Sequence, residues 1–218
     1  MTDVVIDELI PPDSLDGPGG DEFRELIHMR NQVETETLGT DALSVTPEAI
    51  FPHYTSNPQK GRRHFVVRDG GRIVGRGWMG WLTAADAPAV TITADVLHTH
   101  RRRGIGSALF AYMEQVVVEM GRKVVQASVI HTSSDGGERV TASTGFGDVP
   151  ADDAGVQFLQ HHGYGLEQVA RISSLDLTDI AETLENQRAV AQQKAGSDYR
   201  IVEWVGRTPE KWLEQKAA

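Results

Sequence analysis

The sequence predicts an α/β (α+β) fold in which helices flank a mixed central sheet of about six to seven strands. Segments rich in β-branched and aromatic residues alternate with longer segments whose apolar residues recur at helical spacing. Asp69-Gly70-Gly71 joins two of the β-rich segments and predicts a hairpin of antiparallel strands. A later strand–helix–strand segment predicts a parallel pair, and the expected sheet is therefore mixed.

The expected elements follow the order β-α-α-β-β-β-α-β-α-β-α-β, with a further helix from residue 208. Gly39 ends the first helix, and Thr46-Pro47 begins the second. The segment 123–130 is almost continuously apolar, which indicates a buried strand. Strands are expected at 3–9, 63–69, 72–82, 89–97, 123–130, 165–177 and 199–206. Helices are expected at 21–39, 46–57, 106–120, 152–162 and 178–196, and a long polar loop at 131–150.

Composition limits the class of protein. A chain of 218 residues with 39% hydrophobic and 24% charged residues fits one large domain, or one domain and a fragment of another. The absence of cysteine excludes disulfides, cysteine nucleophiles and thiolate metal sites, and it fits a cytoplasmic protein. No apolar run approaches the roughly 20 residues of a spanning helix, and the N-terminus is too acidic for a signal peptide. We therefore expect no membrane partner.

The segment His100–Leu109, HRRRGIGSAL, is the clearest candidate site. It follows an expected strand and opens an expected helix, so free backbone N–H groups at the helix start can meet an anion. Gly104 and Gly106 leave room for that anion to approach the backbone. With a net charge of −10 a nucleic-acid partner is not expected, and a compact anionic ligand is favoured. The alternative interpretation is an exposed basic turn.

Two motifs resemble the GNAT superfamily of N-acetyltransferases. Arg101-x-x-Gly104-x-Gly106, preceded by Val96, resembles its acetyl-CoA motif, although His98 stands where the family has proline. The segment Phe158–Tyr164 looks like the family's F-Y-x-x-x-G-F helix end, and the order of elements matches over residues 1–177. The resemblance implies splayed parallel strands with pantetheine in the gap. It also implies a function, acetyl transfer from acetyl-CoA, the cosubstrate, to a primary amine of a small molecule by direct attack.

The resemblance assigns the cofactor-binding residues. Val96, with the flanking Leu97 and His98, would pair with pantetheine through the backbone, and an N–H near Val96 would polarise the thioester carbonyl. The pyrophosphate would be held by Arg101, Arg102, Arg103, Gly104, Ile105, Gly106 and Ser107.

Catalytic residues are less defined, because Leu159 stands where the family's acidic tyrosine is expected. The other candidates for the acid, at the end of the following strand, are Ser128, His131 and Ser133. The candidates for the base are Asp95, Glu34 and Glu36, each of which could equally be a structural or solvated carboxylate. His98 and His100 lack a nearby third ligand, so no metal is expected.

The C-terminal part leaves the domain organisation open. We expect the acetyltransferase domain at 1–177, a connecting helix at 178–198, and a last strand and helix at 199–218. The segment 199–218 either completes the domain or begins a second half, since the chain resembles the first half of actinobacterial tandem-GNAT proteins. A homodimer or a tandem partner half follows as the expected protein partner. The alternative function is a catalytically silent domain that binds CoA or supports a partner domain.

Overall fold

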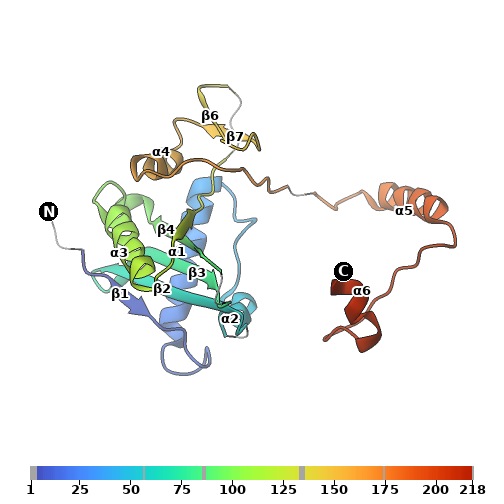
Figure 1. The fold of residues 1–218 in the computed structure, drawn as a ribbon, viewed down its shortest axis with the longest axis horizontal. Helices are drawn as coiled ribbons and strands as arrows, with labels where there is room; N and C mark the ends of the chain where they lie inside the picture. Colours follow the sequence, from blue (N-terminus) through green and yellow to red (C-terminus); the bar gives the residue numbers. More distant parts are fainter. Residues whose placement is uncertain (1–3, 56, 85–86, 133–135, 174, 218) are drawn as a thin grey trace. The chain divides into compact units, whose positions relative to one another are not determined.

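The computed structural model describes residues 4–55, 57–84, 87–132, 136–173 and 175–217, which divide into two compact units, Met1–Val169 and Ala170–Ala218 (Figure 1). The strands are β1 (Asp7–Leu9), β2 (Lys60–Asp69), β3 (Arg72–Leu82), β4 (Ala89–Val96), β5 (Val124–Ala127), β6 (Arg139–Thr141) and β7 (Asp148–Pro150). The α-helices are α1 (Gly20–Leu38), α2 (Pro47–Thr55), α3 (Ile105–Glu119), α4 (Ala154–His161), α5 (Ala181–Ala195) and α6 (Leu213–Ala217), and 3-10 turns lie at His98–His100 and Glu210–Trp212.

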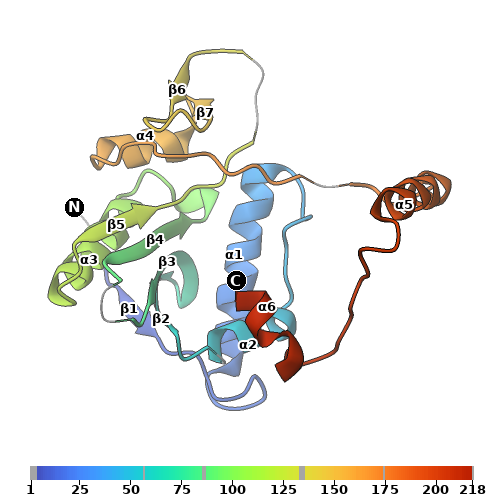
Figure 2. The ribbon, with the colours of Figure 1, turned by 45° about the vertical axis from the view of Figure 1, so that its right-hand side comes forward.

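The central sheet of the first unit has the order β1-β2-β3-β4-β5. Its first three pairs are antiparallel, and β4 and β5, joined through α3, run parallel along one edge (Figure 2). The predicted hairpin is present, with Asp69 opposite Arg72 and the two glycines between them at φ 56° and 83°. The predicted mixed-sheet α+β class is confirmed.

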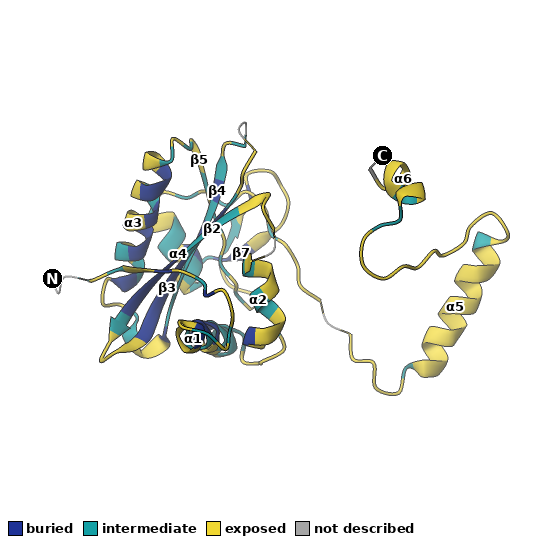
Figure 3. Cartoon of the chain, turned by 90° about the horizontal axis from the view of Figure 1, so that it is seen from below, coloured by how far each residue is buried: buried dark blue, intermediate teal, exposed yellow. Residues whose placement is uncertain are grey.

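Helices α1 and α3 cover opposite faces of this sheet (Figure 1). Strand β3 can lie directly against α3 because Gly75 and Gly77 have no side chain. A Cβ on Gly75 would come within 2.7 Å of Ile105 Cγ2, and one on Gly77 within 3.0 Å of the Met113 sulfur. The buried residues of the sheet, α1 and α3 form one core, dark blue in Figure 3.

The expected count of six to seven strands in the central sheet is wrong, since five strands form it in the described chain. The predicted strands at 165–177 and 199–206 are absent from the described residues there, apart from an isolated bridge at Gln168. Their apolar residues follow a strand-like pattern, but no strand of the described chain pairs with them, and Ile172, Leu175 and Ile201 are exposed. The segment predicted as a loop, 131–150, contains the separate hairpin of β6 and β7.

The described residues of the second unit form no core. No described residue from Ala170 onward is buried, and α5 is exposed up to its last residue, Ala195, which is half-buried (Figure 3). None of the helices in the described ranges is both long and apolar enough to cross a membrane.

Candidate functional site

Strand β4 is longer than its parallel neighbour β5 and leaves a gap beside its last residues. The pairing of β4 with β5 stops at Ile92 opposite Ala127, whereas β4 continues to Val96. Leu97 N–H donates to the Val74 carbonyl of the β3 side (3.0 Å), so alternate residues before it direct their backbone groups to β3. Ala94 and Val96 therefore direct theirs to the β5 side, where the described chain places no strand. The gap offers main-chain donors and acceptors to an extended ligand.

The turn from β4 into α3 is built from backbone conformations that expose N–H groups. Arg102 has φ 62° and Gly104 has φ 83°, and Gly104 caps α3 without any side-chain hydrogen bond. The first-turn amides of Ile105, Gly106 and Ser107 have no intrahelical acceptor, and they point outward with the positive end of the helix dipole. This turn is suited to bind a phosphate-like anion.

Two of the three consecutive arginines brace this turn. Arg101 Nε donates to the Val96 carbonyl (3.0 Å), and Arg103 Nη2 donates to the Thr99 carbonyl (3.0 Å). Arg102 is exposed. The predicted cofactor-binding residues thus lie together, from the end of β4 into α3, and the glycine-containing backbone shapes the anion site more than the arginines do.

Helix α4 packs on the first turn of α3 and brings a histidine that the sequence analysis did not select. His162 Nε2 lies 3.2 Å from Ser107 Oγ, and Phe158 would be 3.5 Å from a Cβ on Gly106. Ser107 and His162 are 55 positions apart, so no local pattern could have linked them.

Tyr164, just after α4, is hydrogen-bonded to α3. Its hydroxyl donates to Glu114 Oε1 at 2.7 Å, and burial together with this hydrogen bond raises the pKa of Tyr164. Leu159 is half-buried against the core and holds no dissociable proton.

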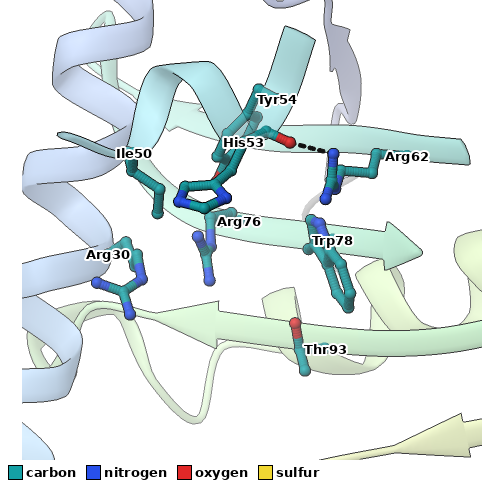
Figure 4. Close-up of a pocket in the computed structure, with 8 residues that line it drawn as sticks. All are labelled: Arg30, Ile50, His53, Tyr54, Arg62, Arg76, Trp78 and Thr93. Carbon is teal, nitrogen blue, oxygen red and sulfur yellow. Dashed lines mark hydrogen bonds between the residues drawn. The ribbon is translucent and has the colours of Figure 1, made fainter. Parts of the chain in front are cut away.

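A cavity lies between α2 and the sheet and has a volume of about 290 Å³. It is built by side chains from five elements, and Figure 4 shows them around the opening. Its lining consists of Arg30 from α1, Ile50, His53 and Tyr54 from α2, Arg62 from β2, Arg76 and Trp78 from β3, and Thr93 from β4.

Two carboxylates stand next to the arginines of this cavity. Glu34 Oε1 lies 2.6 Å from Arg30, and Asp95 Oδ2 lies 2.6 Å from Arg76 Nη2 and 2.8 Å from its Nε. The other oxygen of Glu34 is buried and has no hydrogen-bond partner in the described chain. Burial raises the pKa of Glu34, Arg30 opposes the rise, and the charge of Asp95 adds to it. Glu34 and Asp95, both predicted as candidates for the base, therefore lie in one charge cluster.

Tyr54, which lines the cavity, stacks on the buried ring of His64. The Tyr54 ring lies 4.7 Å from the His64 ring, centroid to centroid, and His64 is 1% exposed. Neither ring nitrogen of His64 has a partner within the described residues, and burial lowers the pKa of His64 to about 3. His64 is thus neutral at physiological pH.

The remaining candidates lie outside this cluster. Glu36 Oε2 accepts the backbone N–H of His98 (3.1 Å), so Glu36 ties α1 to the β4–α3 turn. Ser128 is exposed just after β5, and a ring nitrogen of His131 is 3.1 Å from the Thr132 carbonyl. Ser133 lies outside the described residues.

The acetyltransferase (GNAT) family model matches residues 26–146, more than half of the sequence, and the chain therefore belongs to the GNAT acetyltransferase family. The predicted membership is confirmed, and with it the class of enzyme. A search of curated protein sequences finds no match.

Solved structures with the same fold differ in what their descriptions say they do. A tandem GNAT protein from the clavulanic acid biosynthesis pathway is 21% identical with a TM-score of 0.55, and the match covers 74% of this chain and 43% of that one. An aminoglycoside acetyltransferase from an uncultured soil metagenomic sample, solved with sisomicin, is 20% identical (TM-score 0.52; 79% of this chain, 96% of that one). A transcriptional regulator from Bacillus halodurans is 16% identical (TM-score 0.50; 79% and 99%). The shared fold therefore leaves the substrate open.

Proposed function

We propose that the chain binds acetyl-CoA along β4 and at the β4–α3 turn, and transfers the acetyl group to a primary amine of a small molecule by direct attack in a ternary complex. One observation carries the proposal: the edge of β4 at Ala94 and Val96 faces no strand of the described chain and leads directly into the first-turn N–H groups of α3. The Val96 carbonyl accepts Arg101 Nε, so Val96 offers its N–H to a ligand. A ligand with an extended arm that ends in a pyrophosphate can place its arm along this edge and its pyrophosphate at the N–H groups of the helix.

The coenzyme contacts follow from the backbone. Ala94 and Val96 would pair with the pantetheine arm, and the first-turn amides of Ile105, Gly106 and Ser107 would bind the pyrophosphate, with Arg102 adding charge. Leu97 and His98 would flank the arm by their position only, because their N–H groups already bind Val74 and Glu36.

The reaction needs a base more than an acid. A substrate ammonium gives one proton to Glu34, and the freed lone pair attacks the thioester carbonyl carbon. The C–N bond forms, the C–S bond breaks, and its electron pair leaves on sulfur. The second amine proton reaches the thiolate through water, so Leu159 is no obstacle. Glu34 suits the base role because burial raises its pKa, and Asp95 is the second candidate because Arg76 engages only one of its oxygens.

The domain boundaries also remain a proposal. We propose that residues 1–177 form the acetyltransferase domain, that 178–198 connect it, and that 199–218 belong to a further half. The exposed apolar side chains of Ile201 and Val205 support the last part, since they need cover that the described second unit does not supply.

Calorimetry with acetyl-CoA on the full chain, followed by a thiol-release assay over a panel of amines, tests the function. We expect binding, and Arg102→Glu should weaken it about tenfold, by the loss of a charge-assisted contact to phosphate. Arg171→Glu is the matched control, because it makes the same charge change at an exposed arginine of the second unit. Absence of binding would refute the proposal, and binding without thiol release on any amine would favour the catalytically silent alternative.

A further inference from the structure

We propose that the amine acceptor carries an anionic group, a carboxylate above all, which Arg62 binds in the cavity between α2 and the sheet. The acceptor would then be an amino-acid-sized molecule with a free carboxylate. This inference rests on the proposed function and names the substrate class for the same site.

The charges around the cavity do not balance. Arg30 is paired with Glu34 and Arg76 with Asp95, each at 2.6 Å. Arg62 also lines the cavity, but no carboxylate of the described chain lies within ion-pair distance of it. One guanidinium is therefore left for a ligand.

Arg62 is also held in position. One of its Nη1 hydrogens is donated to the His53 carbonyl in the last turn of α2, a contact drawn in Figure 4. That carbonyl is neutral and leaves the charge uncompensated, while the contact fixes the orientation of the planar group. An oriented guanidinium can bind both oxygens of a carboxylate, which a lysine cannot do in the same way.

The size and the walls of the cavity indicate a small acceptor. Its 290 Å³ lies near the lower end of ligand pockets, which span about 300–1,000 Å³. Ile50, Tyr54 and Trp78 supply apolar surface, and Thr93, opposite Trp78 in the β3–β4 register, supplies a hydroxyl. A molecule with one short apolar part fits such a lining.

The same lining disfavours polycations. A polyamine or an aminoglycoside would place several ammonium groups among Arg30, Arg62 and Arg76, where only the remaining oxygens of Glu34 and Asp95 are left to bind a cation. An amino carboxylate places one ammonium toward the Glu34–Asp95 side and its negative charge toward Arg62. Charge complementarity therefore selects the amino carboxylate.

Matched pairs of amines test the inference on the full chain. Calorimetry measures the affinity for tyrosine against tyramine and for lysine against cadaverine, first with the protein alone and then with the protein saturated with CoA, and spermidine is the polycation. Each pair differs by a carboxylate. We expect the amino acid to bind about tenfold to a hundredfold more tightly than its descarboxy partner, as the loss of a charged hydrogen-bonded pair requires.

Arg62→Gln should remove that preference by weakening the binding of the amino acid, while the affinity for the descarboxy amine should not fall, because the variant removes a positive charge from the cavity. Arg63→Gln is the control, because Arg63 is the adjacent residue of β2 but is paired with Glu8 at 2.6 Å and does not line the cavity. Equal affinities within each pair, tightest binding of spermidine, no binding by either amino acid, or equal effects of the two variants would each overturn the inference. Failure to bind acetyl-CoA or CoA would instead refute the proposed function, and the pair comparison on the protein alone would still decide the role of Arg62.

Discussion

The two candidate sites of the first unit are built in different ways. The site at the end of β4 is made of backbone groups, chiefly from Ala94 to Ser107, and needs only the right register and the right turn. The cavity beneath α2 is made of side chains from α1, α2, β2, β3 and β4. A backbone site can keep one ligand while the sequence changes, whereas a side-chain site changes its ligand with each substitution. This difference fits a shared acyl donor and a variable acceptor.

The largest effect is expected from a charge placed in the backbone site. Gly106→Asp should reduce acetyl-CoA affinity about 1,000-fold, because two like charges roughly 4 Å apart near a protein surface repel by about 4 kcal/mol. The same change should leave folding intact or stabilise it, because a Cβ there meets Phe158 at an ordinary 3.5 Å and an acid favours the first turn of a helix. Calorimetry and thermal denaturation measure the two effects.

Gly106→Ala is the control for the loss of glycine itself: it adds a Cβ without a charge and should weaken acetyl-CoA binding far less than Gly106→Asp does. If Gly106→Asp binds acetyl-CoA normally while folding normally, the backbone site does not hold the pyrophosphate. In that case the end of β4 would not be the binding site of the acyl donor.

The next effect belongs to the side-chain cavity. Glu34→Gln should lower kcat about 100-fold, the usual contribution of a general base, without changing acetyl-CoA affinity. Since the base must be ionised and burial raises the pKa of Glu34, the activity of the original protein should fall as the pH drops through that raised pKa. Steady-state kinetics against pH should show this acidic limb in the original protein and lose it in the variant.

Glu36→Gln is the matched control on the same helix, because a glutamine oxygen can still accept the His98 N–H. It should keep kcat within about twofold. Equal losses in the two variants would mean that these carboxylates act through α1 and not as a base.

A smaller effect, on stability, is expected from the buried His64 next to the cavity residue Tyr54. Between about pH 3 and the ordinary His value near 6.5, the unfolded chain holds a proton on His64 that the folded chain does not, so stability increases with pH. Each pH unit of acidification below about pH 6.5 should therefore lower the free energy of unfolding of the protein by roughly 1.4 kcal/mol, through the protonation of His64 in the unfolded chain. Denaturant unfolding at several pH values measures this slope.

His64→Phe keeps a ring against Tyr54 and removes two nitrogens that have no partner in the described chain. It should raise the unfolding free energy by about 1 kcal/mol at neutral pH and reduce the acid slope. An unchanged slope of unfolding free energy against pH in this variant would show that groups other than His64 cause the loss of stability in acid.

The difference between the backbone site and the side-chain cavity also explains which of the two could be predicted from the sequence. The backbone site lies within one short segment, where a strand, glycines at 104 and 106, and a helix follow one another, so local rules locate it. The hairpin at Asp69–Gly71 is local in the same sense.

The cavity could not be predicted from the sequence, because its lining residues lie between Arg30 and Thr93 in the sequence and only tertiary packing brings them together. Glu34 and Asp95 were selected by position on a helix and a strand, but their common cluster with Arg30 and Arg76 could not be foreseen. The false strands at 165–177 and 199–206 have a related cause. Their alternation is real, but a strand also needs a partner, which no single segment encodes.

The smallest effect is expected at Tyr164, and it decides whether the chain holds a hidden acid. Tyr164→Phe removes the 2.7 Å hydrogen bond to Glu114 and should lower stability by about 1 kcal/mol. It should leave kcat within about twofold, because a hydroxyl that already donates to Glu114, and whose pKa is raised, cannot readily protonate a leaving thiolate. A tenfold fall in kcat with a normal melting temperature would make Tyr164 the acid, in place of the tyrosine that is absent at position 159. An unchanged kcat would exclude Tyr164 as the acid and agree with water as the proton source.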